Sequence, residues 1–230
     1  MTGRRFGHEA TVGLGDVAPS GRARFDALAR WLQDAAYLDV VDAGFERRGA
    51  WVVRRCRIEL GRAPALGERL RLTTWCSGLG KMWAERRTSI AGGAGASAEA
   101  VALWVHVDRD SGRPRPLDDD QVAVWASSAG DHRVRARLSH PDPPPEAVEA
   151  PWHFRRADLD VADHVNNAVY WTVLEEDLDP GADPPAVAEI EFRGAALAGD
   201  ARVRRDGHRW WVCHPDGTVH ASLVTGTASA

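Results

Sequence analysis

The chain has 230 residues, of which 44% are hydrophobic and 27% charged, and its formal net charge is −4. These values describe an ordinary globular protein, and the slightly acidic balance gives no indication of nucleic-acid binding. No run of about 18 apolar residues is present, which argues against a membrane span, and the N-terminal residues lack the apolar stretch of a signal peptide. We therefore expect a soluble, cytoplasmic protein.

Cysteines and histidines follow no metal-binding or disulfide pattern. The three cysteines lack C-x-x-C spacing, and the nine histidines contain no HxxxH or HExxH pair. We therefore expect no structural metal, no cofactor and no disulfide framework. Cys56 and Cys76 fall in expected strands and should be core residues. Cys213 and His214 are adjacent in another strand, so they should point to opposite faces and not form a nucleophilic pair.

The first element along the chain is a helix over about residues 24–43, followed by Gly44 as a C-cap. Its apolar residues recur at spacings of three and four, the pattern of a helix with one buried face. They are Phe25, Leu28, Trp31, Leu32, Ala35, Ala36, Leu38 and Val41.

Four strands should follow this helix and form an antiparallel meander. Residues 51–60, 68–76, 82–90 and 98–107 are rich in Val, Ile, Leu, Thr and Trp. Turns that contain glycine or proline separate them. Because the order is one helix and then consecutive strands, we expect an α+β fold.

Prolines mark a linker over residues 131–151, since proline removes amide donors from a sheet. Beyond the linker the order of elements begins again. We expect a strand at 152–157 and a helix from about 165 to 174. The remaining strands are expected near 186–193, 201–206, 209–214 and 218–225.

Local matches between the halves indicate an internal duplication. Ile58-Glu59-Leu60 corresponds to Ile190-Glu191-Phe192 at an offset of 132 residues. Trp31-Leu32-Gln33-Asp34 corresponds to Val173-Leu174-Glu175-Glu176 in the other helix. We therefore predict a tandem double hotdog, in which each half is an antiparallel sheet wrapped around one central helix. Residues 1–130 form the first half, 131–151 the linker and 152–230 the second half.

Three carboxylates, a histidine and two asparagines gather between residues 158 and 167, where a strand leads into the second helix. The first amides of a helix have no partners within it and carry partial positive charge, so they can polarise a thioester carbonyl. A carboxylate just before the helix can activate water or attack the carbonyl itself. On chemistry alone, Asp and Asn at this place are also the usual helix caps.

The same segment resembles a known family. DLDVADHVNNAVY at 158–170 is similar to the DLD-x-N-x-HVNN-x-x-Y signature of plant and bacterial acyl-ACP thioesterases. In the first half, WLQDAA at 31–36, WVVRR at 51–55, LTTWCSGLGK at 72–81 and VALWV at 101–105 resemble further stretches of that family. The resemblance implies a double hotdog that releases fatty acid from acyl carrier protein, in fatty acid biosynthesis.

Site residues follow from this resemblance position by position. Asp160 matches the family's catalytic aspartate and His164 its catalytic histidine, while Asn166 and Asn167 match the asparagines at the helix start. We predict Asp160 as general base or nucleophile, with His164 or Asn166 positioning water or the carbonyl. The backbone amides near Val165 and Asn166 would bind the developing oxyanion.

Three polar positions of the family are missing. Ala162 stands where the family has a catalytic asparagine, and Ala195 and Ala196 stand where it has a Glu-Cys pair. These replacements predict a slow enzyme, or one with a different base. Asp16, before the first helix, is expected to form a cap or turn rather than a second catalytic centre.

Tryptophans and alternative functions complete the expectations. Most of the ten tryptophans should pack in the core, while Trp75, Trp83 or Trp104 could line an acyl tunnel; Trp75 and Trp104 are our substrate-binding candidates together with Val165 and Asn167. The expected partner is acyl carrier protein, and the protein should be a monomer or homodimer. Alternatives are an acyl-CoA thioesterase, a non-catalytic acyl-binding module and, less favoured by the DLD and HVNN motifs, a hotdog dehydratase.

Overall fold

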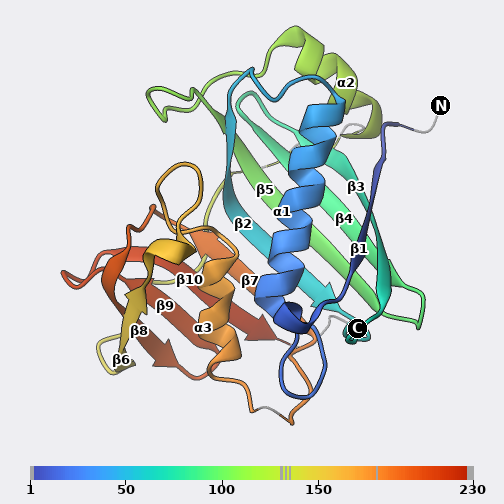
Figure 1. Ribbon diagram of the computed structural model, residues 1–230. Coiled ribbons are helices and arrows are strands. Elements are labelled where there is room, and N and C mark those ends of the chain that lie inside the picture. Colours follow the sequence, from blue (N-terminus) through green and yellow to red (C-terminus); the bar gives the residue numbers. More distant parts are fainter. Residues whose placement is uncertain (1–2, 130–131, 133, 135, 180, 227–230) are drawn as a thin grey trace.

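Ten strands form one continuous antiparallel sheet (Figure 1). The computed structural model describes residues 3–129, 132, 134, 136–179 and 181–226. The strands are β1 (Phe6–Thr11), β2 (Ala50–Leu60), β3 (Arg69–Leu79), β4 (Trp83–Gly92), β5 (Ser97–Val107), β6 (Val148–Phe154), β7 (Val187–Phe192), β8 (Gly199–Asp206), β9 (Arg209–Cys213) and β10 (Val219–Gly226). Their order in the sheet is β1-β3-β4-β5-β2-β7-β10-β9-β8-β6.

This strand order is the same pattern written twice, and β2 and β7 join the two copies. Arg57 and Glu189 are partners at the centre of the pairing, with Cys56 opposite Ile190 and Ile58 opposite Ala188. Ile190 lies 132 positions after Ile58 and is its equivalent in β7, and Ala188 is likewise the equivalent of Cys56. Ile58 therefore pairs with Ala188 just as Ile190 pairs with Cys56. A local twofold axis therefore passes between the halves, as a tandem double hotdog requires.

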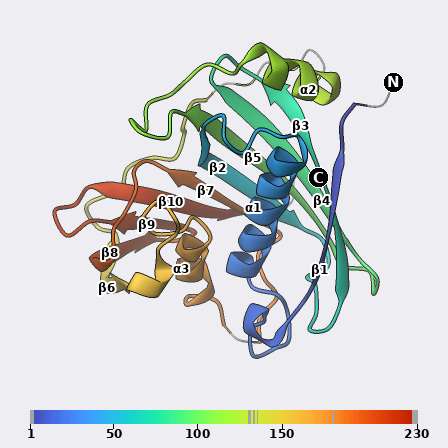
Figure 2. The ribbon, with the colours of Figure 1, turned by 45° about the horizontal axis from the view of Figure 1, so that its top comes forward.

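One helix lies against the sheet in each half (Figures 1 and 2). The long helix α1 (Phe25–Asp42) crosses the first half, and the short helix α3 (Thr172–Glu175) follows a 3-10 turn at Val169–Trp171 in the second half. A further helix, α2 (Asp119–Ala129), covers the end of the first half beside β3.

The apolar stripe of α1 and the inward residues of the strands form the main core. Leu28 of α1, Ile58 of β2, Ile190 of β7 and Leu174 of α3 are all fully buried within it. Because successive residues in a strand point to opposite faces, only alternate positions reach this core. A smaller apolar cluster, which includes Cys76 and Trp125, packs beneath α2.

Several expected elements hold. Helix α1 and strands β2–β5 and β7–β10 lie within a few residues of their predicted ranges. Gly44 follows α1 with φ of 75°, a conformation that glycine adopts without strain. Cys56, Cys76 and Cys213 are buried free thiols, and His214 is exposed beside Cys213, as expected for neighbours on a strand.

The prediction for the second helix was wrong in its start. Regular helix begins at Thr172 rather than near Val165, because Val165 pairs with Leu159 in an isolated β-bridge. The amide of Val165 also donates to the carbonyl of Ala196, which holds the segment extended.

The expected linker also differs from the structure at its end. β6 begins at Val148, within the range predicted as linker, and carries Pro151. Proline fits there because β6 is the last strand of the sheet, so a missing amide donor leaves no neighbouring strand unpaired. Residues 130, 131, 133 and 135 of the boundary region lie outside the described residues. Strand β1 and helix α2 were not predicted from the sequence.

None of the helices in the described part of the chain is both long enough and apolar enough to cross a bilayer.

The pairing of β2 with β7 is the seam between the halves, and we expect it to dominate the free energy of unfolding. Ile190→Ala removes a side chain that is 0% exposed at the centre of this seam, so we expect a loss of about 2–5 kcal/mol of unfolding free energy. The matched control is Val148→Ala in the edge strand β6, where the side chain is 74% exposed. Denaturant titration should show the control within about 0.5 kcal/mol of the parent. Equal losses for the two variants would contradict the seam's role.

Candidate active site

Two loops with the same backbone hydrogen bonds lead into the two helices. Asp16 and Asp158 each accept a hydrogen bond from the amide three residues earlier, at 2.9 and 2.7 Å. The Ala18 amide donates to the carbonyl of Arg22 at 2.8 Å. The Asp160 amide donates to the carbonyl of His164 at the same distance. Asp16 is therefore the equivalent of Asp158, and it forms the expected turn.

An offset of 142 residues relates the two loops and the helices that follow. It makes Ala18 the equivalent of Asp160, and Arg22 the equivalent of His164. In the helices, Phe25 corresponds to Asn167 and Gln33 to Glu175. The two loops therefore share their backbone hydrogen bonds, but they differ in the side chains that could take part in a reaction.

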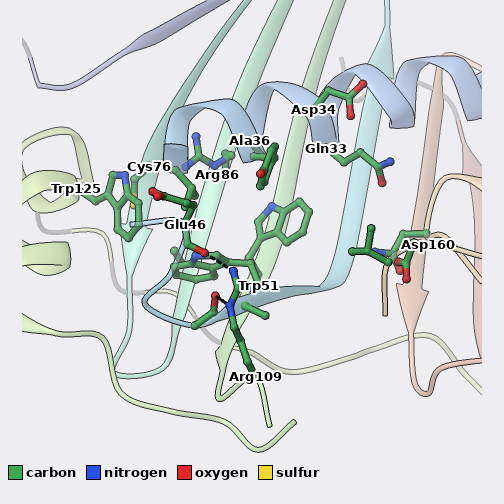
Figure 3. Close-up of a pocket in the computed structure, with 18 of the residues that line it drawn as sticks. Gln33, Asp34, Ala36, Glu46, Trp51, Cys76, Arg86, Arg109, Trp125 and Asp160 are labelled. Atoms are coloured by element: carbon green, nitrogen blue, oxygen red, sulfur yellow. Dashed lines mark hydrogen bonds between the residues drawn. The ribbon is translucent and has the colours of Figure 1, made fainter. Parts of the chain in front are cut away.

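A cavity of about 670 Å³ lies between α1, the first-half strands and the second-half loop (Figure 3). Asp160, Asn166 and Asn167 border it from the loop, while Gln33 and Trp104 border it from α1 and β5. Its other lining residues are Asp34, Ala36, Tyr37, Val40, Glu46, Gly49, Ala50, Trp51, Cys76, Ala84, Glu85, Arg86, Arg109, Trp125 and Val161. Such a cavity, with a largely apolar wall and polar side chains on several sides, suits an acyl chain with a reactive head.

Asp160 is half-buried at the cavity wall. Its Oδ1 accepts the amide of Ala162 at 2.8 Å, while its Oδ2 makes no hydrogen bond with any residue that the structure describes. The turn that follows places Asp163 at φ of 58°, where the equivalent Gly21 has φ of 81°. Nearby, burial raises the pKa of Tyr170 to about 12, so that its phenol stays protonated.

The amides that we predicted for the oxyanion have other acceptors. Val165 N donates to Ala196 O, and Asn166 N donates to Asp158 O, each at 2.9 Å. Neither amide can therefore bind a substrate oxygen without breaking a backbone bond, so the expectation for this pair does not hold. Asn166 borders the cavity and its Oδ1 accepts the Ala168 amide at 2.9 Å, so its catalytic role stays a prediction.

Asn167 supplies the amide that remains. Its backbone N–H makes no hydrogen bond within the described chain, and the residue borders the cavity. It precedes the 3-10 turn of the second helix, where backbone amides point toward the incoming chain. The substrate-binding role predicted for Asn167 thus has an unpaired donor to support it.

His164 is exposed and does not border the cavity, so its catalytic role stays a prediction. Trp104 borders the cavity, and its indole N–H is buried without a hydrogen bond among the described residues. Trp75 and Trp83 point away from the cavity. Arg5 stacks on Trp75 at 4.1 Å, and Trp83 donates to the carbonyl of Val134 at 3.1 Å.

The sequence did not indicate the cavity residues that come from α1 and β4. Gln33 and Asp34 border the cavity from α1, and partial burial raises the pKa of Asp34 although His8 and Arg30 act to lower it. From β4, Arg86 borders the cavity and pairs with the buried Asp39 at 2.7 Å. The signal that could have found Gln33 was its alignment with Glu175, which we used only as a sign of duplication.

In the first half, the position equivalent to the site at Asp160 and Asn167 is filled by a side chain of the protein itself. Glu175 Oε1 accepts the Phe25 amide at 2.7 Å, and Glu175 Oε2 pairs with Arg22 at 2.9 Å. Both side chains are largely buried, with exposures of 10% for Arg22 and 7% for Glu175. With Ala18 in place of Asp160 and the Phe25 amide bonded to Glu175, the described residues at this position offer no counterpart of Asp160 or of the unpaired Asn167 amide.

Comparisons with known proteins decide the family. Residues 3–125 match the model of the acyl-ACP thioesterase N-terminal domain, and residues 142–183 match that of the C-terminal domain. The chain belongs to the acyl-ACP thioesterase family. It is a thioester hydrolase with the double-hotdog fold.

Individual relatives agree with this assignment. An uncharacterized protein of Mycobacterium tuberculosis is 30% identical over 215 residues, covering 92% of this chain and 83% of its own length. Oleoyl-acyl carrier protein thioesterase 1 of Arabidopsis thaliana is 25% identical over 67% of this chain. That match covers 49% of the plant protein, so the chain spans about half the length of this relative.

Solved structures share the fold over the whole chain. The 12:0-ACP thioesterase of Umbellularia californica has a TM-score of 0.79 and 19% identity, covering 98% of this chain and 97% of its own. A putative oleoyl thioesterase of Lactobacillus plantarum has a TM-score of 0.80 and 16% identity, covering 99% and 98%. At such low identity these likenesses concern the fold alone.

In this thioesterase two of the three alanines, Ala162 and Ala196, have backbone roles, while Ala195 is exposed. Ala162 contributes its amide to Asp160, and Ala196, which is 4% exposed, contributes its carbonyl to Val165. Ala195 and Ala196 carry no group that can replace a Glu-Cys pair, so any helper of Asp160 must come from elsewhere in the cavity.

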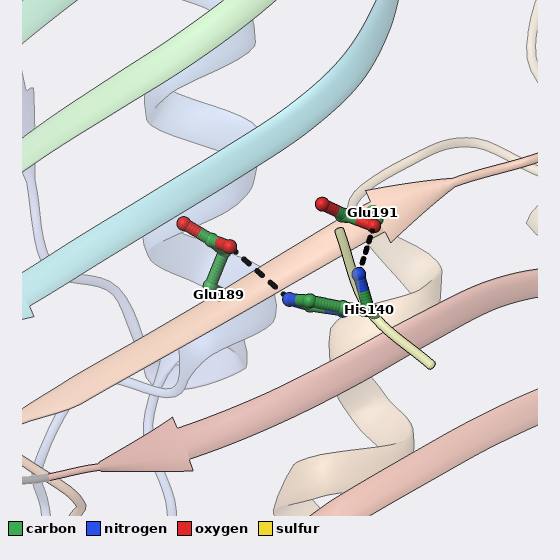
Figure 4. A group of neighbouring side chains, drawn as sticks. All are labelled: His140, Glu189 and Glu191. Atoms are coloured by element: carbon green, nitrogen blue, oxygen red, sulfur yellow. Dashed lines mark hydrogen bonds and ion pairs between the residues drawn. The ribbon is translucent and has the colours of Figure 1, made fainter. Parts of the chain in front are cut away.

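A second polar group, of His140, Glu189 and Glu191, lies on the other side of β7 (Figure 4). Its ligand atoms lie within 4.8 Å of one another, a spacing that could hold a metal ion. However, Glu191 already accepts hydrogen bonds from the amides of Ser139 and His140, and His140 Nε2 meets Glu189 Oε1 at 3.1 Å. These bonds fasten the chain between the halves to the sheet, and we interpret the group as a structural clasp.

The buried ion pair between Arg22 and Glu175 should contribute to the stability of the thioesterase. Glu175→Ala leaves Arg22 largely buried without its anion and the Phe25 amide without its acceptor. We expect a loss of about 3–5 kcal/mol of unfolding free energy. Glu176→Ala, at the exposed neighbouring position, is the control and should change stability by no more than about 0.5 kcal/mol in the same denaturant titration. A Glu175→Ala variant as stable as the control would show that the ion pair is dispensable.

Proposed function

We propose that this thioesterase hydrolyses a fatty acyl thioester carried by acyl carrier protein and releases free fatty acid and carrier. The observation that carries the proposal is that Asp160 and the unpaired amide of Asn167 border the same largely apolar cavity. A base and an oxyanion donor beside an acyl-sized space are the groups that thioester hydrolysis needs.

The reaction follows from these two groups. The thioester oxygen accepts the Asn167 N–H, and the acyl chain extends between α1 and the strands of the first half. Asp160 Oδ2 takes a proton from water as the water oxygen bonds to the carbonyl carbon. When the tetrahedral intermediate collapses, the carbon–sulfur bond breaks and the thiolate takes the proton from Asp160. The products are a carboxylic acid and the thiol of the carrier.

Ala162 shapes the position of the base in this scheme. Its amide holds Asp160 Oδ1, so the carboxylate is oriented without the asparagine side chain that the family signature has at this place. His164 remains a proposed positioning residue, on the same loop but with an exposed side chain. A cytoplasmic location, a place in fatty acid biosynthesis and a monomeric or dimeric state also stay predictions.

The proposal also specifies acyl carrier protein, rather than coenzyme A, as the carrier of the acyl group. The family models and the plant relatives named for acyl carrier protein support it over coenzyme A. Comparing kcat/KM on acyl-ACP and acyl-CoA with one acyl chain separates the two carriers, and we expect the higher value on acyl-ACP. A panel of acyl-ACPs from eight to eighteen carbons then defines the preferred chain length.

Asp160→Asn tests the base. The amide keeps the shape of the side chain but cannot accept a proton, so we expect kcat on acyl-ACP to fall by about 10²–10⁴-fold. Val52→Ala, an exposed position on β2 that does not border the cavity, is the control and should retain the parent rate. Undiminished hydrolysis by Asp160→Asn would refute the assignment, and acyl-chain binding without turnover by the parent protein would favour the non-catalytic alternative.

A further inference from the structure

The loops that lead into the two helices share their backbone hydrogen bonds, but the amides of Phe25 and Asn167 that follow these loops meet different groups. In the first half, the Phe25 amide is taken by Glu175 Oε1 at 2.7 Å. In the second half, the equivalent Asn167 amide is unpaired in the described chain and borders the cavity. A carboxylate oxygen on the Phe25 amide carries the same kind of negative charge as a thioester oxyanion. Glu175 therefore marks, in the closed half, the position that the oxyanion takes in the open half.

Gln33 is the equivalent of Glu175. Like Asn167, it borders both the main cavity and the narrow space that continues beneath α1. Figure 3 shows Gln33 extending from α1 toward the side of the cavity where Asp160 lies. Within the described residues the side chain of Gln33 makes no hydrogen bond, so its amide is free to meet a ligand.

The change from carboxylate to amide at this position has a clear electrostatic consequence. A negative charge there would compete for the Asn167 amide and repel an oxyanion, as like charges do at short range. A neutral amide does not repel the oxyanion, and its NH₂ group supplies a donor that the missing polar side chains of the family no longer provide. We propose that Gln33 is a catalytic residue that donates a second hydrogen bond to the oxyanion held by Asn167. This inference rests on the proposed thioester hydrolysis.

Three substitutions at Gln33 and Trp104 test the proposal with purified protein and acyl-ACP. Gln33→Met keeps the length of the side chain but has no donor, so we expect kcat to fall by about 10²–10³-fold with little change in KM. Gln33→Glu keeps the shape and adds a charge, so kcat should fall further than in Gln33→Met. A purely structural role predicts the reverse order, because glutamate is the closer mimic of glutamine. Trp104→Phe removes another unpaired donor that borders the cavity and should be the milder change.

A matched control separates a local effect from added charge on the helix. Val41→Glu places the same charge on the exposed face of α1, outside the cavity, and should retain the parent kcat. A crystal structure of Gln33→Glu should show the new carboxylate accepting the Asn167 amide, as Glu175 accepts that of Phe25. The proposal is wrong if Gln33→Met keeps kcat within about threefold of the parent. It is also wrong if Trp104→Phe, rather than Gln33→Met, causes the large fall in kcat. Failure of the proposed function is a separate result, because it would appear as no thioester turnover by the parent protein.

Discussion

The antiparallel pairing of β2 with β7 is the constraint on which the rest of the structure depends. It joins two copies of one sheet around Arg57 and Glu189, and thereby sets α1 of the first half beside the loop that precedes α3 in the second. Both halves contribute residues to the cavity. Asp160 and Asn167 come from one copy, and Gln33 and Trp104 from the other. The candidate active site therefore depends on the pairing that joins the halves.

Twofold repetition creates two such places, and the side chains have made them different. The second-half loop retains Asp160 and an open amide at Asn167. The first-half loop has Ala18, and Glu175 with Arg22 occupies the corresponding space. In the closed copy, a buried ion pair between Arg22 and Glu175 stands where the other copy has Asp160 and the open amide, and it connects the start of α1 to α3. One half thus serves the chemistry and the other strengthens the contact that the chemistry needs.

Much of this could be read from the sequence, because the relevant signals are local. The stripe of α1, the strands of both meanders and the DLD and HVNN motifs depend on short-range patterns. They predict the fold correctly, and Asp160, which the motifs single out, borders the cavity. The alignment of Gln33 with Glu175 was also visible. Edge strand β1 and helix α2 were missed, because their patterns are weak before neighbouring strands are known.

What could not be predicted depends on distant partners. The carbonyl of Ala196 takes the Val165 amide, which delays the helix and removes a predicted oxyanion donor. Trp75 lies on the outward side of β3, where Arg5 covers it, and strand alternation alone cannot say which side faces the cavity. Gln33 became a candidate only when the structure placed it at the same cavity as Asn167.

The central claim is that one of two equivalent helix starts binds the oxyanion and the other cannot. An acyl-pantetheine ketone, in which a methylene group replaces the thioester sulfur, is not hydrolysed and presents the carbonyl to the site. With selective ¹⁵N labelling, titration of this ketone should shift the amide resonance of Asn167 and leave that of Phe25 in place. A shift at Phe25, or saturation of the protein without a shift at Asn167, would contradict the account.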